Sequence, residues 1–170
     1  MKLIILNGSS CSGKSTIIKN IMKEKDNFFH LHYDALKWSF SQYSSERHYK
    51  DVQKIILAVA ETVFGMGYNV VSDSSLTRVF REKLINLASQ KGYEIIEINL
   101  EADYEVLLNR FRARVESALK NPERRISNLS EERFKEIFDI CENEKNPLAN
   151  TFRTDTESIE EVSESIMQLL

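Results

Sequence analysis

The stretch that decides the fold runs from Leu3 to Asn20 and reads LIILNGSSCSGKSTIIKN. The four apolar residues at its start predict a short buried strand, and the residues from Lys14 onward have the pattern of a helix. Small and polar residues lie between the two elements. A hydrophobic strand that leads into a helix through a glycine-rich loop is typical of proteins that bind phosphate groups.

This loop fits the pattern G-x-x-x-x-G-K-[ST] at every fixed position. Its small residues allow successive backbone N–H groups to converge on phosphate oxygens, and the helix dipole adds to the attraction. In this pattern Lys14 reaches the β- and γ-phosphates and Ser15 binds Mg²⁺, while Thr16 either supports the α-phosphate or only starts the helix. We therefore expect ATP and Mg²⁺ to bind here, with the nucleotide held by Gly8, Ser9, Ser10, Cys11, Ser12, Gly13, Lys14, Ser15 and Thr16.

The composition of the 170-residue chain suits one globular domain, which we expect to span residues 1–170. The net charge of −3 does not favour a nucleic-acid partner, because proteins dedicated to nucleic acids are usually basic. The two cysteines have neither metal-binding nor disulfide spacing, which fits a reducing compartment. The apolar run 3–6 is too short for a signal peptide or a membrane span. We expect a cytoplasmic protein with no membrane partner.

Short β-rich runs alternate with longer helical patterns, an order typical of a parallel sheet with crossover helices. The predicted strands are Lys2–Asn7, Phe28–Tyr33, Asn69–Ser72, Glu94–Asn99 and Thr151–Arg153. The predicted helices are Lys14–Lys23, Arg47–Phe64, Thr77–Gln90, Tyr104–Leu119 (N-cap Asp103) and Ile159–Leu170 (capping box Ser158 and Glu161). The fold class is therefore α/β: a three-layer α/β/α sandwich with a five-stranded, mainly parallel sheet. Such sheets bind ligands beyond the C-terminal ends of their strands.

Two carboxylates follow predicted strands at that edge. Asp34 ends the second strand, whose C-terminal end we expect beside the glycine loop; it can accept a proton from an attacking hydroxyl, or cap a helix. Asp73 ends the third strand and suits a Mg²⁺ ligand, direct or through water, or a turn-former. His30 and His32 share the strand face of Asp34 and either line the acceptor site or have a structural role.

The candidate cationic residues come later in the chain. Arg110 and Arg114 are four residues apart and share a helix face. Their guanidinium groups can stack on adenine or clamp phosphate, or they can belong to a solvated basic surface. Arg125 lies in a polar segment, and residues 115–128 could close over the phosphates as a lid.

A phosphate-binding loop does not choose among kinases, GTPases and motor ATPases. The chain has no Asn-Lys-x-Asp segment of the kind that switch GTPases use to read their base. Motor ATPases have a long strand that ends in Asp-Glu, and the chain has no such strand. These absences and the short chain favour a kinase with a small substrate.

The order of motifs resembles the small P-loop kinases that include polynucleotide 5′-kinases, zeta-toxin-like kinases and chloramphenicol phosphotransferases. MKLIILNGSSCSGKSTI (1–17) is similar to the start of the last group. GYNVVSDSSLTRVFREKLINLASQKGYEIIEINLEADYEVLLNRFRAR (67–114) resembles the central stretch of the polynucleotide-kinase-like group, and NPERRISNLSEERFKEIF (121–138) resembles its lid and the following helix. The resemblance implies a nucleotide-kinase-like P-loop nucleoside triphosphate hydrolase fold with a small helical lid.

The resemblance also implies roles for individual residues. Lys14 and Ser15 would bind phosphate and Mg²⁺, Asp34 would be the catalytic base, Arg110 would lie against the adenine, and Arg114 and Arg125 would meet the phosphates. Two departures are visible. Ser74-Ser75 follows the third strand in place of the usual pair, and the segment after Asp34 lacks the basic second residue that would grip a nucleic-acid phosphate.

The sequence thus predicts an ATP-dependent phosphotransferase that moves the γ-phosphate to a hydroxyl of a small-molecule acceptor, with Asp34 as the base. Two alternatives stay open. One is a polynucleotide 5′-hydroxyl kinase. The other is an ATP-binding regulatory protein with little turnover.

Overall fold

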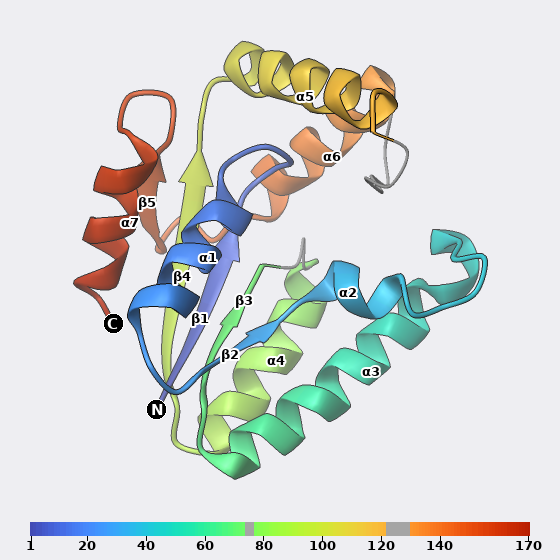
Figure 1. Ribbon diagram of the computed structural model, residues 1–170. Coiled ribbons are helices and arrows are strands. Elements are labelled where there is room, and N and C mark those ends of the chain that lie inside the picture. Colours follow the sequence, from blue (N-terminus) through green and yellow to red (C-terminus); the bar gives the residue numbers. More distant parts are fainter. Residues whose placement is uncertain (74–76, 122–129) are drawn as a thin grey trace.

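The computed structural model describes residues 1–73, 77–121 and 130–170. Five strands form one sheet in the order β2-β3-β1-β4-β5, and every neighbouring pair is parallel (Figure 1). The strands are β1 (Lys2–Asn7), β2 (Phe28–Leu31), β3 (Asn69–Ser72), β4 (Glu94–Glu101) and β5 (Asn150–Arg153). The helices are α1 (Lys14–Glu24), α2 (Tyr33–Lys37), α3 (Ser45–Met66), α4 (Arg78–Gln90), α5 (Tyr104–Leu119), α6 (Glu131–Glu144) and α7 (Ile159–Met167).

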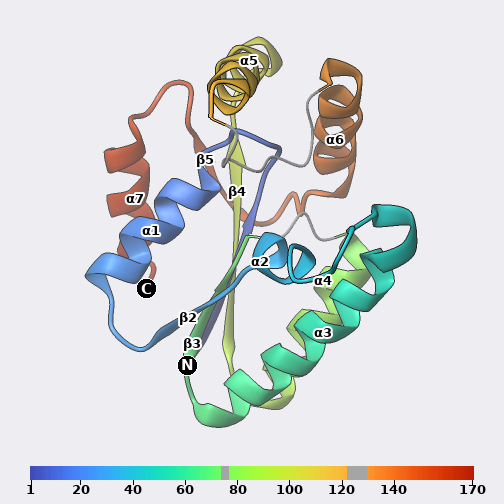
Figure 2. The same ribbon diagram turned by 45° about the vertical axis from the view of Figure 1, so that its right-hand side comes forward.

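Strand β1 lies at the centre of the sheet and feeds a hydrophobic core on each face. Leu3 and Ile5 are fully buried in a cluster with side chains of α3 and α4. Ile4 and Leu6, which alternate with them, are fully buried against α1 and α7 on the opposite face. Figure 2 shows the two helix pairs on opposite sides of the sheet. The three-layer α/β/α sandwich expected from the sequence is confirmed.

A helical pair formed by α5 and α6 lies beyond the C-terminal ends of the strands (Figures 1 and 2). The two helices share a separate core in which the rings of Phe111 and Phe134 stack with centroids 4.6 Å apart. On the exposed side of the helical pair, Arg112 of α5 donates two hydrogen bonds to the Glu131 carboxylate of α6, at 2.7 and 2.8 Å. The pair thus has its own packing and stands over the edge of the sheet where ligands bind in this class of fold.

Several predicted element boundaries are confirmed, and the predicted end of the second strand is wrong. β1, β3 and α5 have the predicted bounds. The second strand ends at Leu31 rather than at Tyr33, because the short helix α2 begins at Tyr33. A helix of five residues has too few positions to show a hydrophobic period, so the sequence pattern could not reveal it.

Two helices were expected to begin at an N-cap side chain, and one of these caps is present. The Ser158 and Glu161 capping box is present: the Ser158 hydroxyl accepts from the Glu161 N–H and the Glu161 carboxylate accepts from the Ser158 N–H. Asp103 occupies the N-cap position of α5, but its side chain does not cap the helix. Instead its carboxylate accepts a hydrogen bond from Arg153 at 2.5 Å, which ties the start of α5 to the end of β5.

None of the helices in the described ranges has the length and apolar character needed to cross a bilayer.

The core between α5 and α6 leads to the first prediction. Replacing the fully buried Phe134 with alanine should lower the free energy of unfolding by about 3–5 kcal/mol, because a large ring is lost from a packed site. Chemical denaturation measures the change. Leu148, which is 92% exposed, provides the control, since Leu148→Ala should change stability by less than about 0.5 kcal/mol. Equal effects of the two substitutions would show that α6 does not pack on α5.

Candidate functional site

The glycine loop, residues 8–13, connects β1 to α1 at the C-terminal edge of the sheet. Its backbone takes left-handed conformations at Cys11 (φ 68°), Gly13 (φ 95°) and Gly8 (φ 144°). A Cβ atom placed on Gly8 would lie only 2.5 Å from the carbonyl oxygen of Leu100 in β4 and 2.6 Å from the Ser12 hydroxyl. Glycine is therefore required at position 8 both by conformation and by the close approach of the neighbouring strand.

Lys14 turns back from the first residue of α1 into this loop. Its ammonium donates hydrogen bonds to the carbonyl oxygens of Gly8 and Ser9, both at 2.7 Å, and lies 3.4 Å from the Ser12 hydroxyl. Burial lowers the pKa of Lys14, and the nearby Cys141 and Asp73 oppose this shift without reversing it. The loop thus fixes one cation within its own curve, next to the free end of α1.

The N-terminus of α1 offers unpaired donors at the same place. No side chain caps the helix, and no described residue accepts a hydrogen bond from the backbone N–H of Gly13, Lys14 or Ser15. Unpaired N–H groups at a helix start, next to a lysine, attract a phosphate oxygen. The Ser15 side chain is exposed beside them. The arrangement suits a triphosphate, as the sequence motif indicates.

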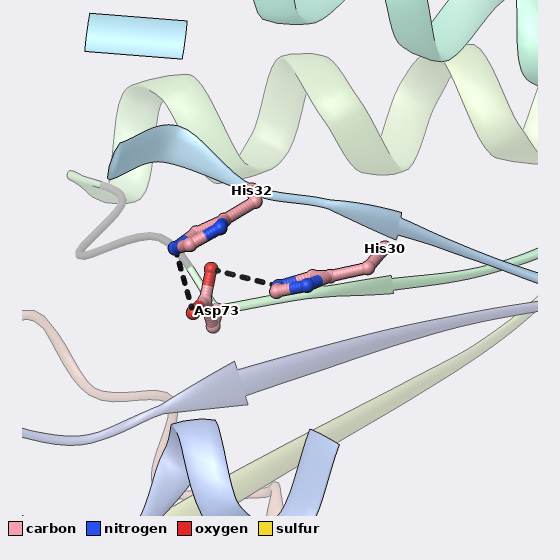
Figure 3. Close-up of side chains that lie close together, drawn as sticks. All are labelled: His30, His32 and Asp73. Atoms are coloured by element: carbon pink, nitrogen blue, oxygen red, sulfur yellow. Dashed lines mark ion pairs between the residues drawn. The ribbon is translucent and has the colours of Figure 1, made fainter. Parts of the chain in front are cut away.

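Asp73 forms a cluster with two histidines at the neighbouring strand ends, drawn in Figure 3. Strand β3 lies directly beside β1, and Asp73 follows its last residue. The Nε2 atom of His30 is 3.4 Å from Asp73 Oδ1, and that of His32 is 3.9 Å from Oδ2. Burial raises the pKa of Asp73, but contact with His30 and the charges of His32 and Lys14 outweigh it, so the pKa lies below its usual range.

The expected placement of Asp34 is wrong in two respects. Strand β3 lies between β2 and β1, so the C-terminal end of β2 is not directly beside the glycine loop. Asp34 also lies in the first turn of α2 rather than on the strand, so the alternation that would put it on the face of His30 and His32 ends before it. The histidines meet Asp73 instead, while Asp34 remains at the same C-terminal edge.

Asp34 is held by a lysine whose role the sequence did not reveal. The Lys37 ammonium donates to Asp34 Oδ1 at 2.5 Å, and the Lys37 side chain is only 7% exposed whereas that of Asp34 is 49% exposed. The ammonium also lies over the rings of Trp38 (4.9 Å), Tyr33 and Tyr43 (both 5.9 Å). Lys37 is thus fixed by its surroundings and holds the half-exposed carboxylate. The i, i+3 spacing of the pair was the available signal in the sequence.

Arg110 joins α5 to the glycine loop. One guanidinium nitrogen donates to the Thr154 hydroxyl at 3.1 Å and lies 3.5 Å from the Cys11 carbonyl oxygen, and the other donates to the Thr154 carbonyl at 2.5 Å. Thr154 is buried, and its own N–H bonds to Glu101 at the end of β4. Nothing in the sequence marked Thr154, because a single threonine after a short strand has no distinctive pattern.

Arg114 lies one helical turn beyond Arg110 on α5, is exposed, and contributes positive charge that lowers the pKa of Lys14. The remaining predicted cation, Arg125, lies outside the described residues, as does the second half (122–128) of the expected lid at 115–128. Residues 115–119 of that segment continue α5 as ordinary helix.

Residues 3–142 match the sequence model of a family described as an AAA domain. The chain belongs to that family. No curated protein gives a significant match to the chain.

Several solved structures have a similar fold over most or nearly all of this chain. A candidate kinase from Chloroflexus aurantiacus is 19% identical, with a TM-score of 0.73 over 99% of this chain and 98% of that one. The APS kinase of Mycobacterium tuberculosis, solved with AMPPNP and APS, is 16% identical, with a TM-score of 0.63 over 99% and 96%. A chain of the Pnkp1/Rnl/Hen1 RNA repair complex is 19% identical, with a TM-score of 0.68 over 84% of this chain and 44% of its own length. The P-loop kinase fold implied by the sequence resemblance is therefore confirmed.

The close approach at Gly8 gives a prediction with an internal control. Gly8→Ala should lower the free energy of unfolding by about 1–3 kcal/mol, because the added Cβ overlaps β4 in a strained conformation. It should also abolish binding of a fluorescent ATP analogue, measured by titration. Gly65, inside α3, has nothing within 4 Å of an added Cβ, so Gly65→Ala should raise stability by about 0.5–1 kcal/mol and leave binding unchanged. A Gly8→Ala protein with normal stability and normal binding would contradict the described loop.

Proposed function

We propose that this AAA domain protein is an ATP-dependent phosphotransferase that moves the γ-phosphate of ATP to a hydroxyl of a small-molecule acceptor. One observation carries the proposal. A phosphate-binding loop with its lysine turned inward shares one edge of the sheet with a half-exposed carboxylate, Asp34, which a buried lysine holds in place. A nucleotide site and a base at one edge are the two parts that phosphoryl transfer to an alcohol requires.

In this proposal the nucleotide occupies the loop and the start of α1. Lys14 and the backbone N–H groups of residues 13–15 bind the phosphates. Arg110, held against Cys11 and Thr154, lies against the adenine. Arg114 and Arg125 stabilise the negative charge that spreads over the transferring phosphoryl group.

The chain also offers oxygen donors that fit Mg²⁺. The exposed Ser15 hydroxyl and the largely buried Asp73 carboxylate are the hard ligands that this ion prefers. Bound there, Mg²⁺ would neutralise charge on the β- and γ-phosphate oxygens. Positioning of the acceptor and removal of its proton remain tasks of the protein side chains.

Asp34 acts as the general base in the proposed reaction. Its exposed side takes the proton from the acceptor hydroxyl as the hydroxyl oxygen forms a bond to the γ-phosphorus and the bond from that phosphorus to ADP breaks. Lys37 positions the carboxylate from its buried side. The aromatic side chains around Lys37 give this part of the site an apolar character that suits an acceptor with a planar or apolar body.

A small acceptor is preferred over a polynucleotide for two reasons. The net charge is −3, and a chain that binds a nucleic-acid backbone normally gains affinity from a cationic surface. The position two residues after Asp34 is Leu36, which cannot grip a phosphate, and the nearby Lys37 is already committed to Asp34. The neighbours named above include a kinase solved with the small molecule APS and a chain of an RNA repair complex, so the fold itself accommodates either class.

The base assignment is tested with labelled nucleotide. Purified protein is incubated with γ-labelled ATP and Mg²⁺ and with nucleosides, sugars, phenicol- and aminoglycoside-type antibiotics and a 5′-hydroxyl oligonucleotide. Label should reach a small-molecule acceptor, and Asp34→Asn should reduce the rate by at least about 10²-fold while ATP affinity stays unchanged. Asp51→Asn, which removes an exposed aspartate on α3, is the matched control and should retain full activity.

Each contrary outcome of that assay selects another function. Label on the oligonucleotide, with affinity that falls steeply as salt is raised, would support the polynucleotide kinase. ATP binding without transfer to any acceptor would support the regulatory protein. Turnover by Asp34→Asn close to the wild-type rate would refute the base assignment alone.

The nucleotide side of the site gives a separate prediction. Arg110→Ala should weaken ATP binding at least about tenfold, because charged hydrogen bonds against the loop are lost together with the contact to adenine. Arg112, two residues away, pairs with Glu131 on the surface, so Arg112→Ala should leave ATP affinity unchanged. Calorimetric titration measures both affinities, and thermal melting of both variants checks that they are folded. Equal affinities would remove Arg110 from the nucleotide site.

A further inference from the structure

We propose that His30, His32 and Asp73 form a binding site for a divalent transition-metal ion of the Zn²⁺ type. The sequence motif accounts for Asp73 only as an oxygen ligand of Mg²⁺, and it gives the two histidines no part in metal binding. The inference does not depend on phosphoryl transfer, because it concerns a set of ligands that the folded chain presents by itself.

Three ligand atoms converge in this cluster from different parts of the sheet. One atom from each of the three residues lies within 4.8 Å of the other two. Both imidazoles present Nε2 to Asp73, one to each carboxylate oxygen, at 3.4 and 3.9 Å (Figure 3). A tetrahedral zinc ion with ligands at about 2.0–2.1 Å keeps them about 3.3–3.4 Å apart. The separation of 3.4 Å between His30 Nε2 and Asp73 Oδ1 is close to that value, and the separation of 3.9 Å between His32 Nε2 and Asp73 Oδ2 is somewhat longer.

The burial of two of these ligand atoms, without a regular hydrogen bond, is the second observation. His30 Nε2 and Asp73 Oδ1 are both buried and face each other at 3.4 Å, and apart from this long contact neither has a hydrogen-bond partner among the described residues. The side chain of Asp73 is only 9% exposed. Buried polar atoms in native proteins nearly always make a well-formed hydrogen bond, so two that meet only at this long distance retain the capacity to bind a cation. A cation placed between the two atoms would satisfy both.

The chemistry of the donors selects the ion. Magnesium prefers six oxygen ligands in an octahedron, whereas imidazole nitrogen suits zinc, cobalt, nickel and iron. Two of the three donors here are imidazole nitrogens. Three protein ligands leave a coordination position open, as in catalytic rather than structural zinc sites. The cluster lies at the C-terminal edge of the sheet, where Asp73 follows β3, the strand directly beside the one that leads into the glycine loop.

Ion binding requires a small rearrangement that can be observed. The two rings are stacked with their planes 14° apart and their centroids separated by 4.6 Å. Because the two Nε2 atoms approach different oxygens of Asp73, at least one ring must turn for both nitrogens to reach one ion. Strand β2 is at the edge of the sheet, and His32 lies beyond its last residue with a side chain that is 40% exposed. The ring resonances of His30 and His32 should therefore shift on metal binding.

The test uses the nucleotide-free protein, so it is independent of whether the chain transfers phosphate. Zn²⁺ is titrated by calorimetry in the presence of millimolar Mg²⁺, and Co²⁺ is titrated by visible absorbance. We expect one ion per chain, a tetrahedral Co²⁺ spectrum and no thiolate-to-metal charge transfer, which excludes binding by Cys11 and Cys141. In proton–nitrogen correlation spectra, the ring signals of His30 and His32 should move while those of His48 stay in place.

Variants make the assignment to these residues. His30→Asn and His32→Asn should each weaken Zn²⁺ binding at least about tenfold, since even the loss of a group that supports a ligand costs that much. His48→Asn, at the third histidine of the chain, should bind as wild type. Thermal melting confirms that the variants are folded. Equal Zn²⁺ affinity of wild type and the His30/His32 double variant, displacement of Zn²⁺ by equimolar Mg²⁺, or a thiolate spectrum would overturn the proposal.

Discussion

The backbone contact between Gly8 and β4 is the constraint on which the rest of the structure depends. The glycine loop can leave β1 and turn into α1 only if its backbone passes within reach of the Leu100 carbonyl, where no side chain fits. That passage brings Lys14 back over the loop and leaves the N–H groups at the start of α1 without an acceptor in the described part of the chain. A buried cation and unpaired donors are costly in an isolated fold. Their presence at the central strand is the reason to regard this edge as a phosphate site.

How much could be predicted from the sequence depended on the range of the interactions involved. The strand, loop and helix from Leu3 to Asn20 were predictable, because the motif is local and each of its positions has a physical reason. The order of strands was not, since β3 lies between β1 and β2 through pairings across dozens of residues. The expectation that β2 borders the glycine loop failed for this reason. The helix α2 escaped detection because five residues carry no period.

The candidate site shows the same division. Arg110 and Arg114 could be placed on one helix face from their spacing, but the partner of Arg110, Thr154, lies forty-four residues away in a segment without a motif. Of the two histidines expected on one strand only His30 lies on it, since β2 ends at Leu31, and both rings face Asp73 at the end of the neighbouring strand. Spacing along the chain identifies which side chains share a face. Only the fold determines what they face.

The arrangement of elements also separates the two halves of the proposed chemistry. Contacts around the glycine loop come from β1, α1, β4 and α5, whereas Asp34, Lys37, His30 and His32 all come from β2 and α2 at the edge of the sheet. Strand β3 and Asp73 lie between the two groups. We therefore expect substitutions in β2 and α2 to change the proposed acceptor and metal sites without disturbing the glycine loop. An edge strand is the easiest part of a sheet to alter, since it has one neighbour instead of two. If the proposed roles are right, acceptor identity in this AAA domain protein is encoded in the short segment from Phe28 to Tyr43, and Asp73 couples that segment to the phosphates.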